Sequence, residues 1–138
     1  MNNPRITAKE RGLIKGAIRR AFARSELHQR ISSRTRIEHS DPNRPRCSKW
    51  SFCEECGLII PTWTTSVDHI QSVIPLNSSM EEMSMDELIN NIWCEESNLQ
   101  VLCDPCHTQK TKEENKIRKQ FKDAKKPPKE KKVKNKKR

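Results

Sequence analysis

Two Cys-x-x-Cys pairs are the residues whose types and spacing predict chemistry most clearly. Cys53 and Cys56 form the first pair, Cys103 and Cys106 form the second, and 46 residues lie between the pairs. Each pair offers two thiolates from one tight turn, and four thiolates in a tetrahedron close a structural zinc site. Because this interval exceeds that of a simple zinc ribbon, we expect a zinc clamp that joins the two ends of a central domain.

These cysteines could also form a redox pair or be small residues buried in a core. Cys47 lies near the first pair and is an alternative ligand, but we expect both Cys47 and Cys94 to be spare thiols. The sequence has no apolar run of the ~18 residues needed to cross a membrane, and its start lacks the apolar core of a signal peptide. We therefore expect an intracellular protein, whose thiols stay reduced or bind metal.

A second set of polar residues has the side chains that hydrolysis requires. Asp68 and His69 are adjacent, Asn98 precedes the second cysteine pair, and His107 follows that pair directly. An ordinary imidazole, with a pKa near 6.5, can accept a proton at neutral pH. A carboxylate and an imidazole leave most of a metal ion's coordination sphere open to phosphate and water. Because neighbours on an extended strand point to opposite faces, one of Asp68 and His69 can face the metal while the other faces the attacking water.

The order of these residues, together with both cysteine pairs, resembles the HNH endonuclease family. The resemblance covers residues 47–115 and includes the segments VDHI and NLQVLCDPCHTQKT. The matching residues are Cys53, Cys56, Asp68, His69, Asn98, Cys103, Cys106 and His107. Small proteins of this layout are frequent in bacteriophages and mobile elements, which is a hint about origin.

The resemblance implies a ββα-metal core, in which a two-stranded hairpin packs on one helix around a divalent ion. It implies that His69 is the general base that activates water and that Asn98 orients the loop carrying this base. It also implies that Asp68 and His107 hold the catalytic metal ion, while the four cysteines hold a separate structural zinc.

The elements that must position these residues can be predicted from local patterns. Residues 58–70 are rich in Ile, Thr, Val and Trp and predict a strand, in which Pro61 indicates an edge or a break. Residues 98–102 predict a second short strand. An aspartate followed by proline at 104–105 is typical of a helix start, so we expect a helix over 105–124.

Charge falls into three blocks along the chain, which has a net charge of +10. Residues 1–50 carry 13 basic and 4 acidic side chains, residues 51–121 carry 5 and 12, and residues 122–138 carry 10 and 2. Two cationic segments therefore flank an acidic centre. A polyanion such as nucleic acid is their expected partner through counterion release, although they can also serve only to keep the chain soluble.

The N-terminal cationic segment is expected to be helical over 7–22, because Thr7 and Glu10 match a capping box and apolar residues follow at helical spacing. A second short helix is expected over 25–31, followed by an extended connector over 32–49. The predicted nucleic-acid-binding residues are Arg11, Lys15, Arg19, Arg20, Arg24 and Lys110. Lys110, one helical turn beyond His107, either touches a phosphate or is an ordinary solvated lysine.

An insert of 28 residues separates the predicted general base from Asn98. Ser84 and Glu87 match a capping box and predict a short helix that ends near residue 92 or 93. The segment 80–97 is acidic, and we expect a solvated helical excursion. The alternatives are that it repels DNA and so shapes a substrate channel, or that it contacts another protein.

The aromatic residues Trp50, Phe52 and Trp63 surround the first cysteine pair and the strand after it. We expect them to pack against the zinc knuckle as part of a small core, rather than to stack on nucleic-acid bases. With 32% hydrophobic and 33% charged residues, the chain has little apolar surface to bury, and a metal staple compensates for a small core.

The sequence thus predicts an α+β protein with a basic helical N-terminal arm over 1–46, an HNH nuclease domain over 47–124 and a disordered basic tail over 125–138. The predicted function is metal-dependent hydrolysis of DNA, with structural Zn²⁺ and catalytic Mg²⁺ or Mn²⁺. One alternative is a non-catalytic zinc-binding module for DNA or RNA. Another is an interaction protein whose acidic insert docks a phage or host protein.

Overall fold

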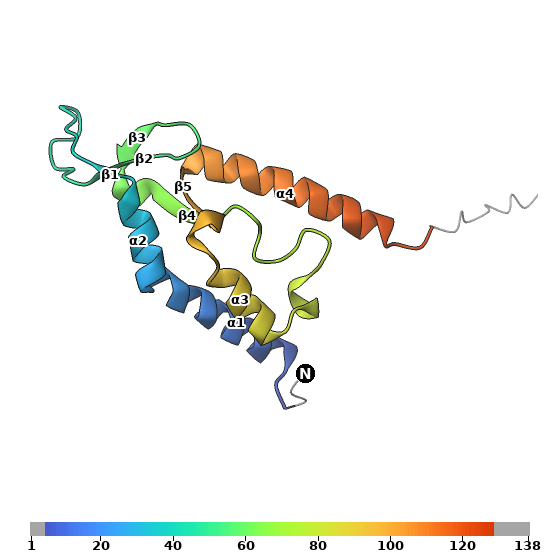
Figure 1. The fold of residues 1–138 in the computed structure, drawn as a ribbon. Helices are drawn as coiled ribbons and strands as arrows, with labels where there is room; N and C mark the ends of the chain where they lie inside the picture. The colour runs from blue at the N-terminus through green and yellow to red at the C-terminus, as the bar shows by residue number, and fades with distance from the viewer. Residues whose placement is uncertain (1–4, 129–138) are drawn as a thin grey trace, which may run out of the picture.

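The structure is a computed structural model that describes residues 5–128 of the chain. Its elements are α1 (Ala8–Ala23), α2 (Glu26–Arg34), β1 (Arg36–Ile37), β2 (Trp50–Phe52), β3 (Ile59–Pro61), η1 (Thr62–Thr64), β4 (Thr65–His69), η2 (Met80–Glu82), α3 (Met85–Ile92), η3 (Glu96–Asn98), β5 (Leu99–Cys103) and α4 (Asp104–Ala124). Within the described residues the fold is mixed α+β, as the sequence predicts (Figure 1). The predicted tail falls largely on residues 129–138, which lie outside the described residues.

The strands form two separate antiparallel sheets. β1, β2 and β3 pair in that order, whereas β4 pairs with β5, with Asp68 opposite Gln100. The single strand predicted over 58–70 is divided between these sheets, because β3 ends at Pro61 and the 3₁₀ turn η1 redirects the chain into β4. Proline has no backbone N–H to continue a ladder, which explains why the break occurs there.

Local capping sets the helix starts that the sequence predicts. The Thr7 hydroxyl accepts a hydrogen bond from the Glu10 backbone N–H at 3.2 Å, and the Glu10 carboxylate accepts one from the Thr7 N–H at 2.8 Å. Ser84 and Glu87 form the same reciprocal pair at the start of α3, at 3.1 and 2.8 Å. Both predicted capping boxes are therefore confirmed, and the predicted helix over 105–124 corresponds to α4.

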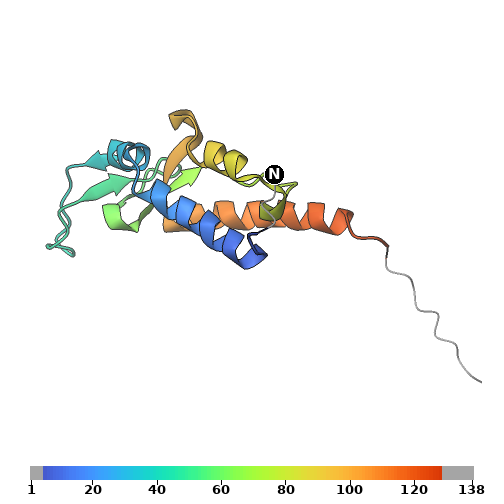
Figure 2. The same cartoon turned by 90° about the horizontal axis from the view of Figure 1, so that it is seen from below.

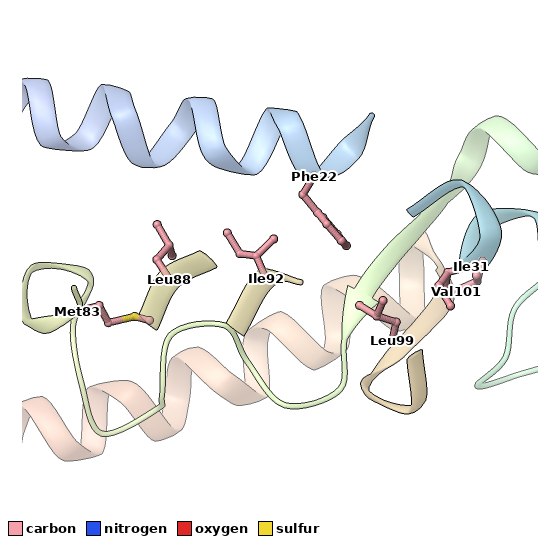
Figure 3. Close-up of a cluster of buried hydrophobic side chains, with 7 residues drawn as sticks. All are labelled: Phe22, Ile31, Met83, Leu88, Ile92, Leu99 and Val101. Atoms are coloured by element: carbon pink, nitrogen blue, oxygen red, sulfur yellow. The ribbon is translucent and has the colours of Figure 1, made fainter. Parts of the chain in front are cut away.

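One hydrophobic core joins the N-terminal helices to the centre of the chain (Figure 3). Its buried residues are Phe22, Ile31, Met83, Leu88, Ile92, Leu99 and Val101. Burial of each large side chain contributes roughly 1.5–3 kcal/mol. The predicted boundary at residue 46 therefore does not separate two cores, because α1 and α2 bury side chains against the same strands as the rest of the core.

The insert between β4 and β5 also contributes to this core. Leu88 and Ile92 of α3 point toward α1 and are only 0% and 2% exposed. The helix is therefore not solvated on all sides, in contrast to the expected helical excursion. Its apolar face is buried and its acidic residues lie on the other side.

The two faces of the β4–β5 hairpin are covered differently. α2 contacts both strands, α1 packs on α3, and α4 contacts both strands as well. Figure 1 shows α1 and α3 together on one side of the molecule and α4 leaving the strands on another, and Figure 2 shows the C-terminal half of α4 extending beyond them. Among the helices over residues 5–128, none combines the length and apolarity that crossing a membrane requires.

Candidate metal centre and active-site cleft

The four predicted zinc ligands lie together in the structure. The sulfur atoms of Cys53, Cys56, Cys103 and Cys106 are all within 4.8 Å of one another. The Sγ atoms of Cys56 and Cys103 are 3.8 Å apart. Zinc–sulfur bonds of about 2.3 Å in a tetrahedron place the sulfur atoms about 3.8 Å apart, so the donor set fits a zinc-sized ion. The cluster can therefore hold a metal ion.

Local backbone geometry presents each pair of thiols. Gly57 has a positive φ of 73°, which favours glycine, and its N–H donates to the Cys53 carbonyl at 2.9 Å. Cys103 ends β5 and is the N-cap of α4, and Cys106 lies in the first turn of that helix. A knuckle and a helix start thus converge from segments far apart in the chain.

The electrostatics of the cluster favour a bound cation. Burial raises the pKa of Cys53, but backbone N–H groups of Cys56, Cys103 and Glu55 outweigh it and lower that pKa to about 7. The pKa of Cys106 is raised by its hydrogen bond with the Cys103 thiol and by burial. Burial likewise raises the pKa of Cys103. One ionised thiolate therefore disfavours ionisation of the neighbouring thiols, because thiolates repel one another. A bound divalent cation would offset this repulsion.

The two remaining cysteines lie apart from this cluster. The Cys47 thiol donates to the Lys49 carbonyl at 3.5 Å, and Cys94 packs against the main hydrophobic core. Within residues 5–128 the four-cysteine cluster is the one group of three or more His, Cys, Asp or Glu side chains close enough to share an ion.

Asp68 and His69 point to opposite faces of β4, as expected for neighbours on a strand. The Asp68 carboxylate faces α4 and accepts hydrogen bonds from Gln100 at 3.0 Å and from Lys110 at 3.1 Å. Nε2 of His107 lies 3.7 Å from the other oxygen of Asp68. His69 faces α1, where its ring lies 5.3 Å from the ring of Phe22.

The protonation of His69 follows from its hydrogen bond. Its Nε2 lies 2.8 Å from the backbone carbonyl oxygen of Ile92 at the end of α3. A carbonyl oxygen only accepts hydrogen bonds, so Nε2 carries the proton. In the neutral ring, Nδ1 is then the nitrogen that can accept another proton.

Asn98 holds the backbone that follows His69. Its side-chain oxygen accepts a hydrogen bond from the Gln71 N–H at 2.8 Å, and its backbone carbonyl accepts one from the Ile70 N–H at 2.8 Å. These two bonds tie the end of β4 to the start of β5. The orienting role of Asn98 stays a prediction.

Lys110 is enclosed by oxygen atoms. Its ammonium group donates to Glu114 at 2.6 Å and to the backbone carbonyl of His69 at 2.9 Å, in addition to Asp68. Burial lowers the pKa of Lys110, but hydrogen bonds with Glu114 and Asp68 outweigh it and raise that pKa. The side chain is 22% exposed, so it is not an ordinary solvated lysine.

Asp68 and His69 both line a cavity of about 430 Å³ between α1, β4 and α4. Its other lining residues are Arg19, Ser72, Val73, Ile74, Lys110, Glu114, Asn115 and Arg118. A larger cavity of about 960 Å³ lies beside it under the loop after β4, but it includes neither Asp68 nor His69. We take the smaller cavity as the candidate active-site cleft because Asp68, His69 and Lys110 line it, whereas Asn98 lines the larger cavity and His107 lines neither of the two.

The predicted DNA-contacting residues of α1 divide into two groups. Arg19, Arg20 and Arg24 are exposed and Arg11 is partly exposed. Lys15 is only 2% exposed, and its ammonium group donates to the backbone carbonyl of Met80. Lys15 therefore connects the insert to α1. Because its side chain is buried, Lys15 is not available to contact a nucleic acid, in contrast to the prediction.

Three residues near the site were not singled out by the sequence. Gln100 reaches Asp68 because the two are opposite each other in the β4–β5 register, and Glu114 reaches Lys110 because it lies one helical turn away. His28 packs edge-on against Phe22, and its pKa is lowered by burial and then by the charge of His69. Register and helical spacing could have suggested the first two, whereas only packing reveals His28.

The aromatic residues near the first cysteine pair have different environments. Trp50 is 3% exposed and its ring packs edge-on against the ring of His39 at 4.7 Å, whereas Phe52 is partly buried. Packing of these two side chains against the zinc knuckle stays a prediction. Trp63 is 77% exposed, which contradicts the expectation that it packs in the core. Trp63 lies in the η1 turn between β3 and β4, in which no residue is buried, rather than in a strand.

Comparison with known proteins gives no match for this chain. No protein-family model, no curated protein and no solved structure matches it.

Proposed function

We propose that this protein is a metal-dependent HNH-type endonuclease that hydrolyses phosphodiester bonds of DNA. The observation that carries the proposal is the hydrogen bond from His69 to the Ile92 carbonyl, which leaves Nδ1 as the proton acceptor beside a cleft that Asp68 also lines. The resemblance to the HNH family supports the same assignment of residues. The products would be 5′-phosphate and 3′-hydroxyl ends.

His69 would act as the general base. Nδ1 removes a proton from a water molecule as its oxygen attacks phosphorus, the bond from phosphorus to the 3′-oxygen breaks, and the departing 3′-alkoxide takes a proton from solvent to give the 3′-hydroxyl. The hydrogen bond to Ile92 supports the imidazolium ion that forms, because Nε2–H faces a carbonyl dipole. Asn98 positions this base through the backbone that follows it.

Asp68 and His107 would hold the catalytic ion, for which Mg²⁺ or Mn²⁺ is expected. Their nearest oxygen and nitrogen atoms are 3.7 Å apart, within reach of one ion that bonds to each at about 2.1 Å. A bound divalent cation supplies charge neutralisation for the phosphate. Gln100 and Lys110 hold the Asp68 carboxylate in place from the opposite side.

The structural ion would be Zn²⁺ in the cluster of four cysteines. Thiolate ligands favour zinc over Mg²⁺ or Mn²⁺, so the two sites would select different ions. Because the second cysteine pair immediately precedes His107, zinc would also fix the start of the helix that carries a catalytic ligand.

DNA would be held mainly through its phosphates. Arg19 lines the cleft, and Arg20 and Arg24 are exposed on the same helix. The excess of basic over acidic side chains in residues 1–50 supports sequence-independent contact with the DNA backbone.

Plasmid cleavage by wild type and His69→Ala tests the proposal. Wild type should nick or linearise plasmid only with added Mg²⁺ or Mn²⁺, and His69→Ala should cut about 10²- to 10⁴-fold more slowly while it binds DNA normally. His39→Ala is the matched control, because His39 is an exposed histidine outside the cleft. Zinc content is measured in each sample so that loss of the structural ion is not mistaken for loss of catalysis.

The proposal fails if His69→Ala cuts as fast as wild type. It also fails if the zinc-loaded wild type binds DNA but cuts no single- or double-stranded form with either ion.

A zinc-stapled, non-catalytic nucleic-acid binder is the second candidate. The observation in its favour is that Lys110 forms ion pairs with both Asp68 and Glu114, so this cluster can be a purely structural ion network. That candidate predicts no Mn²⁺ binding beyond the cysteine site. Isothermal titration of the zinc-loaded protein with Mn²⁺ distinguishes the two candidate functions. A nuclease should bind one Mn²⁺ ion, and the substitution Asp68→Asn should abolish this binding.

A further inference from the structure

One exposed aromatic side chain takes no part in either hydrophobic cluster. Trp63 is 77% exposed, the highest fraction among the large exposed hydrophobic residues over residues 5–128. An indole that stays exposed to water contributes no burial free energy to the stability of the fold. Its position therefore calls for a ligand that would use an aromatic surface.

The backbone beneath Trp63 is firmly held. The N–H of Thr62 donates to the Lys49 carbonyl at 3.0 Å, and the Thr62 hydroxyl bonds to that of Ser51 at 2.8 Å. The hydroxyl of Thr64 donates to the Pro61 carbonyl at 2.7 Å. Trp63 is thus presented outward by a rigid turn, so little entropy is lost when it meets a ligand.

Two arginines share a cavity with this indole. A cavity of about 480 Å³ is lined by Arg44, Pro45, Arg46, Cys47 and Trp63. Within the described residues neither Arg44 nor Arg46 forms an ion pair, and no carboxylate lines this cavity. Hydrogen bonds from the Cys47 N–H to the Arg44 carbonyl and from the Trp50 indole to the Cys47 carbonyl hold this loop in place.

An indole ring and two arginine side chains around one cavity can bind both parts of a nucleotide, the base and the phosphate. The indole offers a face for base stacking, and the arginines offer bidentate donors for phosphate. Bases within a duplex already stack on one another, so the indole can serve only a base that is unpaired. We propose that Trp63, Arg44 and Arg46 form a second nucleic-acid contact that stacks an unpaired base of single-stranded DNA and binds the adjoining phosphates.

The contact lies close to the cleft along the chain. Trp63 precedes Asp68 by five residues, which span at most about 17 Å. A stacked strand rises about 3.4 Å per nucleotide, so the stacked base lies within about five nucleotides of the scissile phosphate. The substrate class that follows is DNA with an unpaired segment beside the cut. This step rests on the proposed function, whereas the binding contact itself does not.

Binding assays without added Mg²⁺ or Mn²⁺ test the contact separately from catalysis. The probes are a fluorescein-labelled oligothymidylate of about 15 nucleotides and a duplex of equal length. Trp63→Ala should weaken single-strand binding about 5- to 100-fold and change duplex binding less than about twofold. Trp63→Phe should retain most of the affinity, because a phenyl ring still stacks.

The contribution of Arg44 and Arg46 can be measured from the salt dependence of single-strand binding. The double variant Arg44→Ala with Arg46→Ala should reduce the slope of log affinity against log salt by about 1.4, the value for two phosphate contacts on a single strand. Circular dichroism and zinc content should match wild type, because all three side chains are exposed.

Equal single-strand affinity of Trp63→Ala and wild type would overturn the proposal. Equal losses on single strand and duplex would overturn it as well, since they would mean general contact without base stacking. Because neither binding probe is tested with Mg²⁺ or Mn²⁺, no cleavage enters the binding measurement. Failure of the nuclease proposal therefore appears in cleavage, and failure of this one appears in binding.

Discussion

The cysteine cluster joins the knuckle at Cys53 and Cys56 to the junction of β5 and α4, the Asp68–His69 cleft lies between α1, β4 and α4, and the two are built on opposite plans. The cluster brings four groups of one kind together, which repel one another when ionised. The cleft combines acidic and basic side chains, with Asp68 and Glu114 both paired to Lys110. We expect the first plan to need a cation, whereas the second has ion pairs of its own and leaves about 430 Å³ for a ligand.

The largest expected effect comes from the cysteine cluster. Cys103→Ser should abolish cooperative unfolding, because structural zinc contributes roughly 10–16 kcal/mol in small domains and the whole fold has only about 5–15 kcal/mol. Thermal circular dichroism and zinc content measure this. Cys47→Ser, outside the cluster, should keep full zinc and the wild-type melting curve. A zinc-loaded Cys103→Ser that melts normally would mean that the cluster is not the staple.

The cleft should respond in the opposite way. Under the nuclease proposal, Asp68→Asn should slow DNA cleavage by at least about 100-fold, because the variant lacks a proposed metal ligand, and should leave zinc content unchanged. The melting temperature should shift by only a few degrees, since the amide still accepts the hydrogen bond from Gln100. Asp86→Asn, on the exposed side of α3, is the control. Unfolding of Asp68→Asn would remove the distinction between the two regions.

A smaller effect on stability is expected at Glu54, which connects the turn between Cys53 and Cys56 to strand β5. Glu54 accepts two hydrogen bonds from Arg34 at 2.8 Å and one from the Val101 N–H at 2.7 Å. Glu54→Ala should cost about 1–3 kcal/mol, because the buried Val101 N–H loses its acceptor. Glu55→Ala, in the same knuckle, should stay within about 0.5 kcal/mol of wild type in urea unfolding. Equal effects of the two substitutions would show that zinc alone holds the knuckle.

The smallest expected effect is a pH dependence of the same contact. Burial raises the pKa of Glu54, but hydrogen bonds from Arg34 and from the Val101 N–H outweigh it and hold the pKa below the ordinary value of 4.5. Glu54 thus contributes stability that is fully present above pH 4.5 and is lost as the pH falls through the lower folded pKa. The stability difference between wild type and Glu54→Gln should be constant from pH 7 to 5 and shrink below that. A difference that grows on acidification would mean that the carboxylate is not held ionised.

Much of the candidate site could be predicted because its signals are local or compositional. The Cys-x-x-Cys pairs, the capping boxes at Thr7 and Ser84, and the alternation of Asp68 and His69 depend on residues within a few positions of one another. The environments of Lys15 and Trp63 could not be predicted in this way. A lysine within an amphipathic helix normally faces water, and a tryptophan in an apolar strand normally faces the core.

By itself, the sequence determined the metal-ligating residue types, the helix starts and the separation of basic from acidic blocks, since each depends on side-chain chemistry or on hydrogen bonds within one turn. Only the tertiary structure decided that α1 and α3 share a core with the hairpin, that Lys110 is enclosed by Asp68 and Glu114, and that the partner of His69 is the Ile92 carbonyl. The physical reason is distance along the chain: the contact between His69 and Ile92 spans 23 residues and that between Lys15 and Met80 spans 65, and contacts of that range follow from strand register and packing.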